Sequence, residues 1–464
     1  MTLSSLHPQK KGASFSALLF VLLLSILSLA PQQAEAQVSA VPEVLQSYIE
    51  IALKQNPEMS ASRARWEQAD ARVDQANSNL WPKVDVTARY TTFDGGRIIA
   101  IPNGPSLEAA QFGITKWDNK LEAAWPIFNY AVWQGTKATK AYLSAATHEV
   151  EAKELAVAYQ VSEAYFNYAK ASELVTIRQN AVELAKQNLA TAQALFTAQK
   201  VAKNDVLRAE VAVAAAQGES LTAQNQQMLA RTNFNNILKR DYDAEIMLMP
   251  QQALNEYRGQ GPRLAANDGA GQSGTLTSFS TDYGNAVGNR PEIMQIDNAK
   301  VALEGLKNVN AADYFPNLAV FASYGWQEDK LTFGSEALLI GGVQMRWNLF
   351  QGFNTNAKVA ETAAQIHELE YQKESLLNGI RIELHNARLD RDNARERYAI
   401  AIKQLESAEE NRRITKALYD AGQAPLITMI DAENTLANAK ANLTVTTYDE
   451  LMAEAKYRKA IGTR

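Results

Sequence analysis

An internal repeat limits the folds that this chain can adopt. Residues 52–59 read Ala-Leu-Lys-Gln-Asn-Pro-Glu-Met, and residues 286–293 read Ala-Val-Gly-Asn-Arg-Pro-Glu-Ile. Another proline lies 25 residues after the proline of each copy, at Pro82 and at Pro316. A duplication of this length predicts two similar structural units in one chain.

The first 36 residues are typical of a secretory signal peptide. Lys10 and Lys11 precede an apolar run over about 15–30, and Ala34-Glu35-Ala36 offers small residues at the positions that a signal peptidase reads. We expect cleavage after Ala36 and export of the remaining chain. A permanent membrane anchor is the alternative, which the short apolar run disfavours.

Composition excludes several classes of function. The formal net charge is −5, which argues against nucleic acid as a partner. The chain has no cysteine, so thiolate metal sites are excluded. No phosphate-binding loop, metal cluster or nucleophile arrangement is present, so we expect no catalytic residues and no cofactor.

Most of the chain reads as helix, because long proline-free stretches are rich in Ala, Glu, Gln, Lys and Leu. In the longest stretches, apolar and small residues recur by alternating threes and fours, which predicts coiled-coil packing. A helix of about 70 residues would be about 100 Å long. The predicted long helices cover about 131–198 and 203–240 in a first repeat (37–257), and about 353–421 and 425–461 in a second repeat (281–464).

Four segments of about ten residues alternate between apolar and polar side chains and predict strands. They cover about 82–93, 115–128, 316–327 and 338–350; the second and fourth end in the motif Trp-x-x-Phe. Aromatic residues near the ends of an apolar face are typical of transmembrane barrel strands. A soluble antiparallel sheet with one hydrated face shows the same alternation and remains an alternative from the strands alone.

The signal peptide and the long helices favour the membrane barrel. Loops at about 94–114 and 328–337 then face outward, and a glycine-rich stretch at 258–280 is expected to be a flexible connection between the repeats. After Ala36 no apolar stretch is long enough for a transmembrane helix, so any crossing would have to use strands.

Four strands are too few to close a barrel, since the smallest membrane barrels have eight and are filled by side chains. Three copies would supply twelve strands around an open lumen and twelve long helices in a hollow tube. The predicted fold is therefore a mixed α and β membrane protein. Long coiled-coil helices predominate, each chain has four transmembrane strands, and a homotrimer forms a 12-strand β-barrel continued by an α-helical barrel.

The order, duplication and spacing of these motifs resemble the TolC family of outer membrane efflux proteins over about residues 40–463. The resemblance implies an outer membrane channel that extends into the periplasm, a passive exit duct of a tripartite efflux or type I secretion system. It implies a periplasmic adaptor (membrane fusion) protein, an inner-membrane transporter and outer membrane lipid as partners. The cargo stays open between drug, metal, siderophore, polysaccharide and protein. The alternative function is a periplasmic coiled-coil adaptor or scaffold of an export complex.

The resemblance also places adaptor-docking helix tips at Gln199, Lys200, Gly422 and Gln423. Glycine at position 422 suits a left-handed residue at a helix end. With Gln199 at the matching place, we expect the first tip to be built differently.

The resemblance further implies a periplasmic aperture at Asp431 and Thr428, and a gate latch at Asp205 and Tyr419. Ala424 stands where the family's latch has an arginine, and Thr428 occupies the second position of the family's acidic ring, so a looser and less cation-selective gate is expected. The alternatives are a solvated helix position for Asp431 and a simple helix cap for Asp205.

Overall fold

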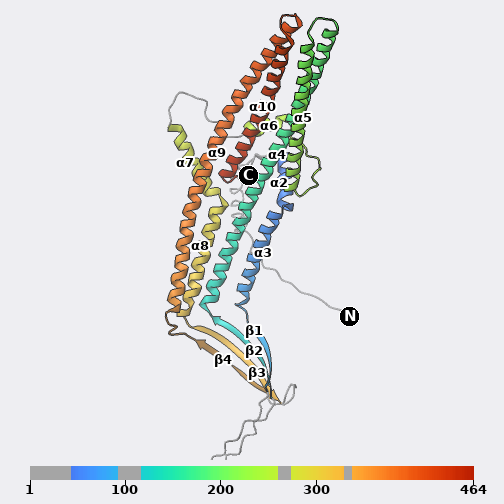
Figure 1. Cartoon of the computed structure of the whole chain (residues 1–464). Helices are drawn as coiled ribbons and strands as arrows, with labels where there is room; N and C mark the ends of the chain where they lie inside the picture. Colours follow the sequence, from blue (N-terminus) through green and yellow to red (C-terminus); the bar gives the residue numbers. More distant parts are fainter. Residues whose placement is uncertain (1–42, 92–115, 260–272, 329–336, 464) are drawn as a thin grey trace, which may run out of the picture. The chain divides into compact units, whose positions relative to one another are not determined.

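The computed structural model describes residues 43–91, 116–259, 273–328 and 337–463 (Figure 1). The expected signal peptide (1–36), the expected loop at 94–114 and nearly all of the one at 328–337 lie outside these residues. So does the central part of the expected connection at 258–280.

The two halves of the chain repeat one order of elements: short helices, two strands and two long helices. The first half contains α2 (Glu43–Gln55), α3 (Pro57–Ser78), β1 (Lys83–Thr91), β2 (Lys116–Phe128), α4 (Tyr130–Thr197), α5 (Lys203–Ile237) and the short α6 (Gln251–Gly259). The second half contains α7 (Ser273–Asn289), α8 (Pro291–Asn310), η1 (Ala311–Tyr314), β3 (Asn317–Glu328), β4 (Ala337–Arg346), α9 (Asn354–Asp420) and α10 (Leu426–Ala460).

Each very long helix packs against one long and one short helix of its own repeat. Helix α4 contacts α3 and α5, helix α9 contacts α8 and α10, and the halves meet through contacts of α4 with α8 and α10. A buried cluster around Tyr165, Phe166 and Phe234 gathers side chains from α2, α4, α5, α6 and α10. No helix in the described part of the chain combines the length and apolarity needed to cross a lipid bilayer.

The repeated Asn-Pro and Arg-Pro motifs fasten each short helix to the end of a long one. The Asn56 amide donates to the backbone carbonyl of Ile237 at 3.2 Å, where α5 ends. In the second half the Arg290 guanidinium donates to the carbonyl of Lys459 at 3.2 Å, where α10 ends. The last carbonyls of a helix lack partners within it, so they can accept such bonds. The carbonyl of Lys459 also accepts the backbone N–H of Gly462 at 3.0 Å. The repeat seen in the sequence is therefore a repeated helix junction.

The four strands form one antiparallel sheet in the order β1-β2-β3-β4. The register places Val86, Leu121, Tyr324 and Leu339 side by side, and Asp85, Glu122 and Ser323 in the adjacent row. Since neighbouring residues of a strand point to opposite faces, the apolar alternations of the strands lie on one face. Most of that face is exposed in the single chain, with 74% exposure at Val86 and 71% at Leu339.

The tryptophans of the two Trp-x-x-Phe motifs secure the strand ends in the same way. The Trp125 indole N–H donates to the carbonyl of Leu80 at 2.9 Å, and that of Trp347 donates to the carbonyl of Tyr314 at 3.2 Å. Both acceptors lie two residues before the proline that precedes the first strand of each pair. Each bond thus ties the entry of a strand pair to its exit.

Three details differ from the sequence expectations. Strand β4 ends at Arg346, so Trp347 and the rest of its motif lie beyond the strand. Residues 273–280, expected within the connection, belong to α7, because Phe279 and Tyr283 pack against a buried cluster with α9 and α10. The short helices α2, α3 and α8 were also not predicted as separate elements.

Candidate functional site at the helix tips

The α4–α5 tip (residues 198–202) turns through a residue in left-handed conformation. Gln199 has φ +58°, its N–H donates to the carbonyl of Phe196 at 2.9 Å, and the N–H of Lys200 donates to that of Leu195 at 2.9 Å. These two bonds define a Schellman motif, which normally places glycine at the left-handed position.

The α9–α10 tip (residues 421–425) has the same geometry. Gly422 has φ +72° and donates to Tyr419 at 2.9 Å, while Gln423 donates to the carbonyl of Leu418 at 2.8 Å. The expectation that Gln199 forces a different turn is therefore wrong. Glutamine adopts the left-handed conformation instead, at a conformational cost of about 1–2 kcal/mol that glycine avoids.

Exchanging the residues at these two positions should have opposite effects. Gln199→Gly is expected to stabilise the first tip by up to about 1 kcal/mol, and Gly422→Ala to destabilise the second by a similar amount. A Cβ at Gly422 would contact no atom within 4 Å, so the second effect would be conformational alone. Amide hydrogen exchange of the last turns of α4 and α9 measures both. Equal protection in all variants would contradict the expectation.

The two residues expected in the latch lie near each other but form no hydrogen bond. Asp205 is in the first turn of α5, whose N-cap is Ala202, so the alternative of Asp205 as the cap itself does not hold. The hydroxyl of Tyr419 is buried and has no hydrogen-bond partner within the described chain. Burial raises the pKa of Tyr419, and the carboxylates of Asp205 and Asp420 raise it further. The structure thus places the two side chains close together without a hydrogen bond between them.

Both residues expected at the aperture are exposed, one turn apart on α10. The Thr428 hydroxyl donates to the carbonyl of Pro425 at 2.7 Å, in the first turn of the helix. Asp431 follows three residues later, and its side chain is exposed. Next to them, Leu426 and Ile430 pack against Val206 in a buried cluster that joins α10 to α4 and α5. The aperture residues are therefore on the opposite side of α10 from this contact.

A buried carboxylate close to the tips was not expected from the sequence. Glu433 of α10 accepts a hydrogen bond from the Asn188 amide of α4 and lies 3.9 Å from a guanidinium nitrogen of Arg412 on α9. In the sequence Asn188 lies four residues after Leu184 and seven before Leu195, which is the spacing of a coiled-coil seam. A polar residue in such a seam is the signal that could have prompted a search for its partner.

Comparison with known proteins identifies the family. Residues 48–238 and 283–463 match the family model described as outer membrane efflux protein. The chain belongs to this family. The two matched segments correspond to the two halves of the fold, and the match confirms the resemblance found in the sequence.

Curated relatives are distant but match nearly the whole chain. Outer membrane protein TolC of Escherichia coli (strain K12) is 23% identical over 458 residues, covering 92% of this chain and 84% of that protein. Nodulation protein T of Rhizobium leguminosarum bv. trifolii is 21% identical over 426 residues, covering 90% and 85%.

Solved structures of outer membrane proteins share the fold. The CmeC channel of Campylobacter jejuni superimposes with a TM-score of 0.72 at 19% identity, covering 90% of this chain and 86% of that one. VceC of Vibrio cholerae gives a TM-score of 0.70 at 17% identity, covering 90% and 96%. The family match identifies this chain as an outer membrane efflux protein.

Proposed function

We propose that three copies of this chain form a passive exit duct of a tripartite efflux or type I secretion system. The duct would be a 12-strand β-barrel in the outer membrane, continued by an α-helical barrel into the periplasm. The proposal rests on the sheet, whose edge strands lack partners in the described chain and whose apolar face is uncovered. Within the described strands β1 and β4 are both edges, and the apolar face is exposed. Pairing β4 of one copy with β1 of the next would satisfy both edges, and lipid would cover the apolar face.

The outer face of α5 supports the same assembly. Apolar side chains recur along it with the spacing of a coiled-coil seam, and they are exposed in the single chain. They are Leu207 (48% exposed), Val211 (70%), Leu221 (59%) and Met228 (58%). We call this set the α5 stripe. A seam of this kind needs a second helix to cover it, and the long helices of a neighbouring copy supply one.

In this assembly the tips form the periplasmic end of the duct. Gln199, Lys200, Gly422 and Gln423 are exposed and would dock a periplasmic adaptor that connects the duct to an inner-membrane transporter. Three copies of Asp431 and Thr428 would line the aperture, and Asp205 with Tyr419 would form the latch beside it. The hydroxyl of Tyr419 has no hydrogen-bond partner in the described chain, and this supports a weak latch.

Recording single channels in planar lipid bilayers tests the proposal. Three carboxylates around a narrow mouth attract a monovalent cation by roughly 1 kcal/mol at physiological salt, so Asp431→Asn should lower the cation-to-anion permeability ratio about fivefold. Glu409→Gln, which removes an exposed carboxylate of α9, is the control and should leave the ratio unchanged. An unaltered ratio in Asp431→Asn would refute the aperture, and a monomer without conductance would refute the duct.

A further inference from the structure

Glu433 connects the two helical hairpins, α4–α5 and α9–α10, through one carboxylate. The residue is only 7% exposed. One oxygen, Oε2, accepts the hydrogen bond from Asn188 of α4. The other, Oε1, is buried and accepts no hydrogen bond from the described residues, while Arg412 of α9 lies 3.9 Å from it. A buried carboxylate with one unsatisfied oxygen favours its neutral form.

The surroundings of Glu433 carry little compensating charge. A cavity of about 30 Å³ beside it is lined from α4 and α5 by Leu184, Asn188 and four alanines, none of them charged. Among the described residues, the charged groups that act on Glu433 are Arg412 and Lys416, both on α9. Burial raises the pKa of Glu433, while Asn188, Arg412 and Lys416 lower it without cancelling the effect of burial.

A polar groove lies along the α9–α10 hairpin at the same level. A groove of about 670 Å³ lies between the two helices and is lined largely by polar side chains, among them Gln404, Ser407, Asn411, Asn438 and Asn442. Such a seam buries little apolar surface, so it contributes little to holding the hairpin rigid. Near the tips, the buried links from this hairpin to α4–α5 are then the small cluster around Ile430 and the carboxylate of Glu433.

We propose that Glu433 is a proton-sensitive clasp that holds the α9–α10 hairpin to α4. When Glu433 is protonated, the carboxyl is neutral and its burial costs little, so the clasp is closed. When Glu433 is ionised, the buried charge favours separation of the hairpins, which hydrates it. The clasp itself follows from the contacts above. Its consequence is that the duct mouth parts at higher pH, and only this consequence rests on the proposed function.

The direction of the pH dependence follows from linkage. A carboxyl whose pKa is higher in the clasped state than in the parted, hydrated state binds its proton more tightly when clasped. The clasp is therefore strongest below the ordinary glutamate pKa of 4.5 and weakens as pH rises through the raised value. For each unit by which the two pKa values differ, the ratio of clasped to parted molecules changes about tenfold.

The absence of cysteine allows a direct distance measurement. Spin labels at Gln193→Cys on α4 and Ala421→Cys at the end of α9, both exposed positions, report the separation of the hairpins. Doubly labelled chain diluted into unlabelled chain restricts the signal to distances within one chain. We expect the population at longer distance to grow between pH 5 and pH 8, and Glu433→Gln to keep the short distance at both pH values. Glu409→Gln should respond as the natural chain does.

A second variant makes the test independent of Glu433→Gln. The hydrogen bond from Asn188 lowers the pKa of Glu433, so Asn188→Ala should move the midpoint of the distance change to higher pH. A distance that does not change with pH, or a change that persists in Glu433→Gln, overturns the clasp. Because this measurement needs no conductance, failure of the duct and failure of the clasp are distinguishable: channels that conduct without a pH-dependent distance refute the clasp alone.

Discussion

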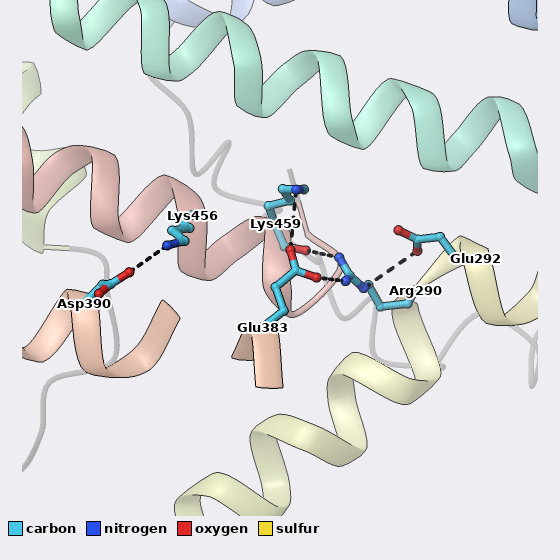
Figure 2. Close-up of polar contacts among 6 residues, drawn as sticks. All are labelled: Arg290, Glu292, Glu383, Asp390, Lys456 and Lys459. Atoms are coloured by element: carbon cyan, nitrogen blue, oxygen red, sulfur yellow. Dashed lines mark hydrogen bonds and ion pairs between the residues drawn. The ribbon is translucent and has the colours of Figure 1, made fainter. Parts of the chain in front are cut away.

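Replacement of Arg290 by leucine is expected to destabilise the second half of the fold by about 3–5 kcal/mol, the usual cost of breaking a buried ion pair. The Arg290 side chain is only 4% exposed, and it reaches three helices at their junction (Figure 2). It pairs with Glu383 of α9, lies 3.7 Å from Glu292 of α8 and donates to the carbonyl of Lys459 of α10. Leucine would leave the carboxylate and the carbonyl without this donor.

One contact moderates the loss. The Lys459 ammonium lies 3.4 Å from Glu383 and stays in place when the guanidinium is removed, so we expect the lower part of the range. Arg290→Asn installs the residue of the first half, where Asn56 reaches the matching carbonyl with its amide. It should cost less than leucine if asparagine regains the bond to the end of α10.

The neighbouring pair of Lys456 and Asp390 is the matched control. Its atoms are 2.7 Å apart, but the side chains are 41% and 51% exposed, so Lys456→Met should cost less than about 1 kcal/mol. Urea unfolding followed by hydrogen exchange of α8 and the end of α10 measures both variants. Equal losses in Arg290→Leu and Lys456→Met would contradict the junction role of Arg290.

Much of the fold could be predicted because local sequence patterns indicate its main elements. Stretches without proline mark α4 and α9, and the alternation beginning at Val84 marks β1, since each depends only on residues close in sequence. The register then places the apolar alternations on one face without further information, because side chains of a strand alternate strictly. The first Trp-x-x-Phe motif ends β2 as expected, whereas the second lies beyond β4.

The details of the candidate site depend on contacts that local patterns do not contain. Gln199 adopts the same turn as Gly422 because two backbone hydrogen bonds and the packing of the helices outweigh the preference of one side chain. Glu433 looks like any helix carboxylate in sequence, and its burial depends on Asn188, which is 245 residues away. In the sequence Arg290 is likewise only one residue of a repeat. Its role depends on the end of α10, which the fold brings beside it.

Two acidic substitutions in the α5 stripe are expected to abolish the proposed trimer. Leu221→Glu combined with Met228→Glu removes two large apolar side chains that are 59% and 58% exposed in the single chain. Burying such a side chain contributes about 1.5–3 kcal/mol. The interface recurs three times in a closed trimer, so the loss is multiplied in each assembly. Each buried glutamate would add an unpaired charge at the same place.

A control variant separates the effect of the added charge from the effect of its position on α5. Thr222→Glu combined with Gln226→Glu adds the same two carboxylates at exposed positions of the same helix that lie outside the stripe. Native mass spectrometry in detergent should show monomer for the stripe variant and trimer for this control. Circular dichroism of both should stay unchanged, because neither pair is buried within the chain. A trimer that survives in the stripe variant would mean that the α5 stripe does not hold the copies together. The proposed arrangement of helices between copies would then be wrong.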